Sequence, residues 1–471
     1  MKETLLLLVT ALALAGCTSL APDYQRPVAP VAQAWPSGTG ASSASAGNAV
    51  ADRTWQQFFT DERLRELIGQ ALEHNRDLRV AALNIERARA LYRIEQADRV
   101  PMVAVGAGMT AQRTPGSLTA SGSSETTRRY DVAAGISGYE LDFFGRVRSL
   151  NEAALQEFLA TEQARDSAQI SLVAEVANAY LTLAAERERQ RLASETLENQ
   201  RDAHALIQRR VESGMASQID LRRSQTTVDA ARADLARYTA LAVQAENALA
   251  LLAGGPVNPS LLPDSLAPVA SLDILPVGVP SQVLQRRPDI RGVEHRLQAA
   301  HAQIGVARAA YFPSITLTAS GGVASGALST LFKSGSGAWA FEPLVTLPIF
   351  DSGRRRAAVK VAEAERGMLL AEYEGTLQRA FREVADALAV RSTLGEQLEA
   401  QESLVAATAD TFRLSEIRFQ QGAQSYLEVL DAQREMYAAQ QGLIAVRLTR
   451  LENQVLLYKA LGGGWEGTAA T

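Results

Sequence analysis

Apolar residues recur at intervals of three and four along two long stretches of the chain. The stretches run from Gly145 to Gly214 and from Gly353 to Gly422, so the second follows the first at an offset of 208 positions (353 − 145 and 422 − 214). Neither stretch contains a proline. This spacing is typical of an amphipathic helix. Because a helix rises 1.5 Å per residue, each stretch predicts a rod of roughly 100 Å.

Before each long stretch the pattern changes to a two-residue alternation, which indicates β-strands. The first pair of alternating runs follows Pro101 and is separated by a polar loop at 112–129; the second pair follows Pro313. The apolar positions are Val103, Val105, Ala107 and Met109, then Tyr130, Val132, Ala134 and Ile136, then Ile315, Leu317 and Ala319, then Trp339, Phe341, Val345, Leu347 and Ile349. We therefore expect two hairpins, at 101–139 and 313–349.

The whole plan occurs twice, which indicates an internal duplication. Repeat 1 (61–255) would contain a helix, the hairpin 101–139, a long helix 145–213 and a return helix 218–253. Repeat 2 (281–464) would contain a helix, the hairpin 313–349, a long helix 353–421 and a return helix 425–461. Six prolines make 256–280 an irregular linker, and 465–471 would be a tail. The predicted fold class is mainly α, with four strands plus long helices in an internally duplicated protomer.

The N-terminus has the features of a processing signal. Lys2 precedes an apolar run that ends in Leu14-Ala15-Gly16-Cys17, so 1–16 is predicted to be a signal peptide. Cys17 is the only cysteine and is the predicted lipidation site, because Leu-Ala-Gly-Cys resembles the lipobox of bacterial lipoproteins. The alternative is a plain signal peptide with an incidental cysteine. Residues 17–60 should form an extended, poorly packed segment, with packing beginning at Trp55.

Composition excludes several classes of function. A net charge of −5 implies no large nucleic-acid-binding surface. The sequence after the N-terminus contains no apolar run long enough to predict a transmembrane helix. The four histidines are scattered, and no nucleophile elbow, phosphate loop or cysteine pair occurs. We expect neither an enzyme nor a bound metal or cofactor, apart from covalent lipid on Cys17.

Four strands of about ten residues could cross a bilayer but could not close a barrel. Open sheet edges are not tolerated in lipid. Either the strands form a soluble sheet, or several copies pool them into one barrel, and the lipidated N-terminus favours the second. A lipid-anchored structural coiled-coil protein without a pore stays an alternative.

The chain resembles TolC-like outer membrane efflux proteins of the lipoprotein (OprM/NodT-type) branch. The resemblance covers essentially the whole sequence and depends on four motifs in order: 139–146 (YELDFFGR), 285–290 (QRRPDI), 307–314 (ARAAYFPS) and 430–434 (LDAQR). It implies a homotrimer with a 12-stranded outer-membrane β-barrel and a periplasmic α-helical barrel. It also implies a partly unstructured equatorial belt, formed by 18–60, 256–280 and the C-terminus.

The resemblance places a periplasmic gate where the helix pairs turn. It implies that Leu427 and Asp431 project inward as rings, and that Arg418 and Arg434 make polar links, with Asp220 as a partner. An apolar ring blocks by dewetting and an acidic ring holds cations. Phe419 stands where relatives often carry a tyrosine that makes a gate link. The adaptor-contacting tips would include Ser213, Gly214, Met215, Gln421, Gly422 and Ala423.

The expected function is that of the outer-membrane channel of a tripartite multidrug efflux system, a passive gated conduit for drugs and small amphiphiles. The expected partners are a periplasmic membrane-fusion adaptor, a resistance–nodulation–division pump of the inner membrane, and outer-membrane lipid. The expected location is the outer membrane, lipid-anchored and extending into the periplasm. The alternative within the family is an exit duct for protein secretion.

Overall fold

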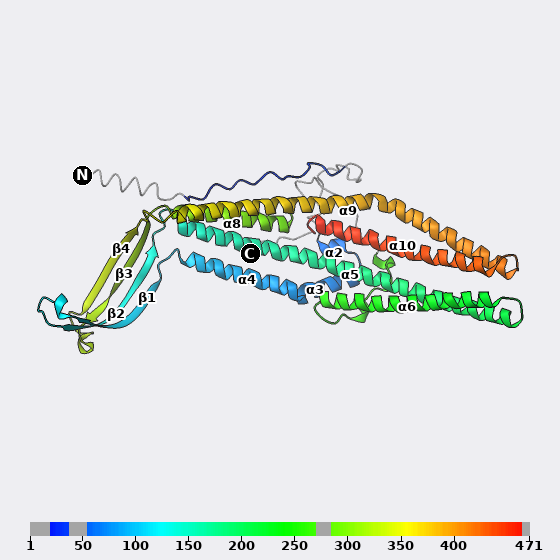
Figure 1. Ribbon diagram of the computed structural model, residues 1–471, viewed down its shortest axis with the longest axis horizontal. Coiled ribbons are helices and arrows are strands. Elements are labelled where there is room, and N and C mark those ends of the chain that lie inside the picture. The colour runs from blue at the N-terminus through cyan, green and yellow to red at the C-terminus, as the bar shows by residue number, and fades with distance from the viewer. Residues whose placement is uncertain (1–18, 37–53, 270–283, 464–471) are drawn as a thin grey trace. The chain divides into compact units, whose positions relative to one another are not determined.

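The computed structural model describes residues 19–36, 54–269 and 284–463 (Figure 1). The predicted signal peptide, Cys17 and the predicted tail 465–471 therefore lie outside the described residues. The helices are α2 (Trp55–Phe58), α3 (Glu62–His74), α4 (Arg76–Ala97), α5 (Arg146–Glu212), α6 (Gln218–Leu252), α8 (Pro288–Ala309), α9 (Arg354–Gln420) and α10 (Tyr426–Ala460). The strands are β1 (Val103–Thr114), β2 (Glu125–Glu140), β3 (Ser314–Ser325) and β4 (Gly337–Thr346).

The protomer is mainly helical with one four-stranded sheet, as the fold class predicted. The chain divides into two compact units. Unit 1 comprises the described parts of Met1–Pro27, Asn84–Thr161 and Gly292–Tyr373. Unit 2 comprises the described parts of Val28–Leu83, Glu162–Arg291 and Glu374–Thr471. Helices α4, α5, α8 and α9 contribute residues to both.

The duplication is visible in the lengths of the helices. Helices α5 and α9 each have 67 residues, α6 and α10 each have 35, and α4 and α8 each have 22. Gly214 and Gly422 end the long helices in the left-handed conformation, with φ of 74° and 75°. A residue with a Cβ adopts this conformation at a cost. The two glycines therefore explain why both helices stop at equivalent places.

The sheet of unit 1 is antiparallel throughout, in the order β1-β2-β3-β4, so β1 and β4 are its edges (Figure 1). The expected loop at 112–129 is too long: β1 continues to Thr114 and β2 begins at Glu125. Backbone pairing persists there because the ladder does not depend on apolar side chains. At the other end, Leu347 and Ile349 lie beyond Thr346, where β4 ends.

Unit 2 is held by an apolar cluster to which α2, α3, α5, α6, α9 and α10 contribute. Apolar residues of α5 at the predicted helical spacing lie in it, with Val176, Tyr180 and Leu183 all at 0% exposure. The ring of Phe58 stacks on Tyr458 at 4.3 Å. Among the described helices, only α5 contains an 18-residue window apolar enough to cross a membrane, and 61% of that window is buried. Burial of this kind is typical of a core helix.

The described part of the N-terminal segment is extended but better packed than expected. In unit 1, the Arg26 guanidinium donates to both carboxylate oxygens of Glu294, at 2.7 and 2.9 Å, and the Tyr24 hydroxyl donates to the same group at 3.0 Å. In unit 2, Trp35 stacks on Phe381 at 5.0 Å. The proline-rich composition predicted the extended backbone, but the residues between the prolines find partners far away in sequence.

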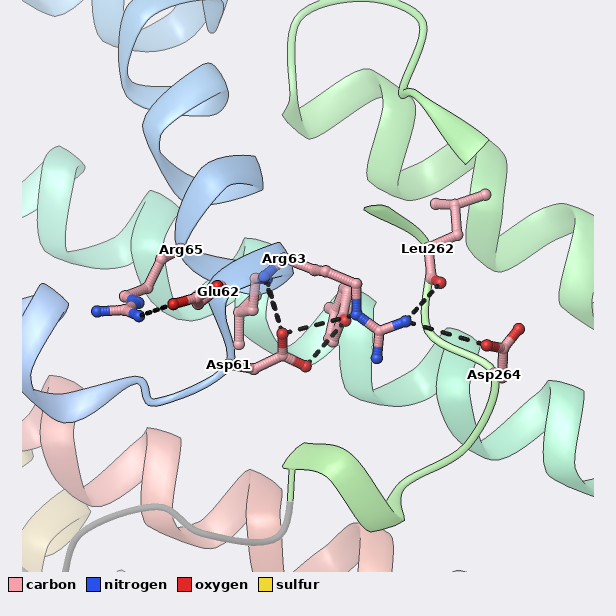
Figure 2. Close-up of polar contacts among 8 residues, drawn as sticks. Asp61, Glu62, Arg63, Arg65, Leu262 and Asp264 are labelled. Carbon is pink, nitrogen blue, oxygen red and sulfur yellow. Dashed lines mark hydrogen bonds and ion pairs between the residues drawn. The ribbon is translucent and has the colours of Figure 1, made fainter. Parts of the chain in front are cut away.

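A polar cluster fixes the start of α3 (Figure 2). The Asp61 carboxylate accepts from the backbone N–H groups of Arg63 (2.9 Å) and Leu64 (3.4 Å) and from the hydroxyl of Tyr180 (3.1 Å). The Arg63 guanidinium donates to the carbonyl of Leu262 at 3.5 Å. The contacts with Tyr180 and Leu262 join α3 to α5 and to the irregular segment after α6. The described part of that segment, 256–269, holds only short 3-10 turns.

Candidate gate at the ends of the helix hairpins

The two helix hairpins of unit 2 turn by the same backbone motif. The N–H of Met215 donates to the carbonyl of Arg210 at 2.7 Å, and the N–H of Ala423 donates to that of Arg418 at 2.8 Å. With the left-handed glycines, these are Schellman turns. The side chains of the predicted tips, namely Ser213, Met215, Gln421 and Ala423, are all exposed in this protomer.

Helix α10 has two distinct faces just after its turn. One face packs inward and carries Tyr426, Val429, Leu430 and Gln433, all buried. The other carries Leu427, Asp431 and Arg434, spaced four and three residues apart and exposed. Asp431 and Arg434 form an ion pair at 3.3 Å. Three of the predicted gate residues thus share one face of α10.

The buried face of α10 belongs to a small apolar cluster, which we call the tip core. It consists of Ile207, Tyr426, Val429 and Leu430, with Val211, Leu221, Phe412 and Phe419 packed against it. The Phe419 ring lies 5.3 Å from that of Tyr426, and the Arg210 guanidinium lies 4.5 Å above it. Phe419 therefore takes part in aromatic and cation–π contacts.

The other two predicted link residues are not brought together. Asp220 forms a capping box with Ser217 at the start of α6, accepting from its hydroxyl at 2.6 Å. The exposed Arg418 side chain has no ion-pair partner among the residues that the structure describes. Asp220 nevertheless lies near Tyr426: burial, and then the Asp220 carboxylate, raise the pKa of that phenol to about 12.

A second set of polar contacts, which the sequence did not predict, joins α6 to α10. The hydroxyl of Tyr437 donates to Asp234 at 3.2 Å, and the hydroxyl of Tyr238 donates to Gln441. Arg237 donates to Asp234 at 2.9 Å and to the Tyr238 oxygen at 2.8 Å. The one available signal was that Tyr238 is the only aromatic residue of α6.

Within the described ranges, no group of three His, Cys, Asp or Glu side chains could hold a metal ion. Two histidines are engaged in structural hydrogen bonds, His204 with Ser224 and His295 with Gln156, both at 2.7 Å. The ring of His301 lies 5.4 Å from that of Tyr24. These contacts stabilise helix packing.

The family model of outer membrane efflux proteins matches residues 67–255 and 279–463, one match for each repeat. The chain belongs to this family. Its members are efflux proteins of the outer membrane, which is not an enzyme class.

Relatives match the chain along nearly its whole length. The probable efflux pump outer membrane protein TtgC of Pseudomonas putida is 47% identical over 465 residues, covering 98% of this chain and 96% of its own. The outer membrane protein OprJ of Pseudomonas aeruginosa is 44% identical over 461 residues, covering 98% and 95%. The open state of the MtrE outer membrane channel of Neisseria gonorrhoeae superposes with a TM-score of 0.86 at 38% identity, covering 96% of this chain and all of that one.

Proposed function

We propose that this protein is the outer-membrane channel of a tripartite efflux system, a passive conduit for drugs and small amphiphiles with no catalytic role. One observation carries the proposal. The chain matches efflux outer membrane proteins and a solved outer membrane channel along nearly its full length. The sheet agrees with this, because no described strand pairs with the outer edge of β1 or of β4. A conduit built from several copies would use both edges.

The sheet supports a homotrimer. Strands β1 and β4 present open edges, which cannot stand in lipid, and four strands are too few to enclose a channel. Large apolar side chains such as Trp339 (82%), Phe341 (59%) and Val105 (75%) are exposed on the isolated protomer. Three copies pairing β1 with β4 would give twelve strands, bury every edge and turn these side chains to lipid.

The alternatives are less well supported. A coiled-coil protein without a pore gives no reason for an exposed, apolar, four-stranded sheet. An exit duct for secreted proteins could share the fold, but the matched relatives are named for efflux. We therefore retain efflux as the proposed function.

The gate in this proposal is formed by Leu427 and Asp431. Both lie on the exposed face of α10, outside the tip core that fixes its orientation. Repeated by three-fold symmetry, they would give an apolar ring and an acidic ring four residues apart. Arg434, paired with Asp431, would tune the acidic ring. The exposed Arg418 and the capping residue Asp220 would make links to neighbouring helix pairs.

The exposed tips would contact a periplasmic membrane-fusion adaptor, which would connect the channel to a resistance–nodulation–division pump. Small or flexible side chains at the tips, such as Ser213, Met215 and Ala423, allow close approach of another helix end. For the anchor, we propose covalent lipid on Cys17. Ser19, the first described residue, lies within 3.5 Å of Ser149, early in α5 and close in sequence to the end of β2. That supports an anchor on the sheet side of unit 1.

A complementation experiment tests the proposal. A strain lacking this gene would be supplied with the intact protein or with a variant lacking 103–140, which removes β1 and β2. The intact protein should restore growth on amphiphilic drugs and migrate as a heat-sensitive trimer, whereas the variant should do neither. Drug sensitivity that the intact protein leaves unchanged, with protein secretion restored instead, would refute efflux.

A further inference from the structure

A cavity of 460 Å³ lies beside the tip core, between α5, α9 and α10 of unit 2. Its walls include the side chains of Leu206 and Ile207 from α5, Phe412 and Phe419 from α9, and Val429 from α10. We call it the tip cavity. Its volume lies in the range of small-molecule pockets, and aromatic and aliphatic walls are what such pockets share.

A buried tyrosine that lines the tip cavity has an unpaired hydroxyl. Tyr426 is 7% exposed and its hydroxyl is unpaired among the described residues. Gln433, which also lines the tip cavity, is 8% exposed. Buried polar groups in folded proteins are nearly always paired, because leaving one unpaired is costly. The unpaired hydroxyl of a residue in the cavity wall indicates a missing hydrogen-bond partner.

The charges around the tip cavity favour a cation. Asp202 of α5 and Glu416 of α9 line it; among the described residues of its wall only Arg209 is cationic, and the Arg210 guanidinium packs on the ring of Phe419. The Arg209 guanidinium donates to the carbonyl of Ala205, in the preceding turn of its own helix. Both carboxylates would attract a protonated amine bound near them.

We propose that the tip cavity binds a small aromatic amphiphile carrying a protonated amine. The aromatic group lies between Phe412, Phe419 and Leu206, the ammonium group faces Asp202 and Glu416, and a polar substituent takes up the hydrogen-bonding capacity of Tyr426 and Gln433. Binding itself does not depend on the proposed function.

Because of where the tip cavity lies, binding would affect the candidate gate, and this consequence rests on the proposed function. The ligand touches α5, of the first helix hairpin, and α9 and α10, of the second. A ligand that binds both hairpins at once stabilises the arrangement in which they are adjacent. Because Leu427 and Asp431 follow Tyr426 directly on α10, an occupied cavity restricts the movement of the candidate gate.

The test measures binding of N-(1-naphthyl)ethylenediamine to the full-length trimer in detergent by calorimetry, with 1-ethylnaphthalene as the uncharged probe. Ala203 lines the tip cavity, so Ala203→Trp fills it; Ala205→Trp, on the exposed side of the same helix, is the matched control. Saturable binding of the amine should be lost in the first variant and kept in the second. Asp202→Asn with Glu416→Gln should weaken binding of the amine about tenfold, since two exposed carboxylates are removed. Binding of the uncharged probe should not change.

Equal binding of the amine to both tryptophan variants would overturn the proposed site. So would the absence of saturable binding to intact trimer, which is the result expected if a second copy of the chain fills the cavity. Should Ala203→Trp not assemble, Gln433→Leu replaces it and is expected to weaken the amine at least threefold. Planar-bilayer recordings then separate the two claims. Binding without a fall in open probability removes the gating consequence, whereas a channel that does not conduct in any variant rejects the proposed function and leaves the site standing.

Discussion

Replacing Asp61 by alanine should destabilise α3 far more than replacing a neighbouring residue would, because its one carboxylate accepts hydrogen bonds from three donors. It accepts from two backbone N–H groups at the start of the helix and from the hydroxyl of Tyr180. Its side chain is 6% exposed and Tyr180 is fully buried, so water does not replace the lost acceptor. Burial, and then the charge of Asp61, raise the pKa of Tyr180, which stays a donor.

The size of the effect follows from these contacts. Loss of an N-cap costs about 1 kcal/mol, and an orphaned buried hydroxyl costs about 2 kcal/mol. Asp61→Ala should therefore lower the free energy of local opening by about 3 kcal/mol, which corresponds to about 100-fold faster exchange of the α3 amides. Asp61→Asn keeps the cap and should cost about 1 kcal/mol or less.

Hydrogen–deuterium exchange of the detergent-solubilised protein, read over residues 62–74, measures this effect locally. Glu62→Ala is the control, because its ion pair with Arg65 joins two side chains 91% and 36% exposed and should contribute under about 0.5 kcal/mol. Adding Tyr180→Phe to Asp61→Ala should slow exchange again, since it removes the orphaned hydroxyl. Exchange in Asp61→Ala within threefold of the Glu62→Ala control, or further acceleration by Tyr180→Phe, would refute the reasoning.

Two further predictions concern backbone conformation and pH. Gly254→Ala should lower the thermal stability of the trimer strongly, because φ is +77° and the new Cβ would lie 2.4 Å from the carbonyl oxygen of His74; Gly214→Ala, at φ +74° with open space around it, should cost only about 1–2 kcal/mol. Equal losses of melting temperature would contradict this. Burial, followed by the charge of Arg366, lowers the pKa of His301 below 6.5, so the unfolded state binds the proton first and stability should fall as the pH drops below 6.5. Limited proteolysis near Tyr24 should thus be faster at pH 5 than at pH 7.5 in the intact protein, but not in His301→Gln.

The fold class could be predicted because local rules set most of it. Helical spacing without proline specified the two long helices, and glycine at Gly214 and Gly422 marked where a left-handed residue ends them. The strands were harder to delimit: Gln112 and Arg129 looked like loop residues, yet both are paired in the sheet. Backbone pairing extends beyond the apolar stretch, and side-chain polarity does not report where it stops.

Contacts between distant parts of the chain were not predictable. Tyr238 meets Gln441, and Tyr437 meets Asp234, only because two hairpins from different repeats lie against each other. Periodicity gives the buried face of each helix but not the residue opposite. The candidate gate had one local signal, since Leu427 and Asp431 lie one turn apart away from the buried face of α10. Their role depends on other copies of the chain, which sequence patterns do not position.

Single-channel conductance in planar bilayers tests the central claim most directly. Intact trimer should show low, cation-preferring conductance. Leu427→Ala with Asp431→Ala should raise it sharply, and Glu428→Ala, which removes an exposed carboxylate outside the gate face, should not. Properly assembled trimer that does not conduct, with or without the gate substitutions, would contradict the channel.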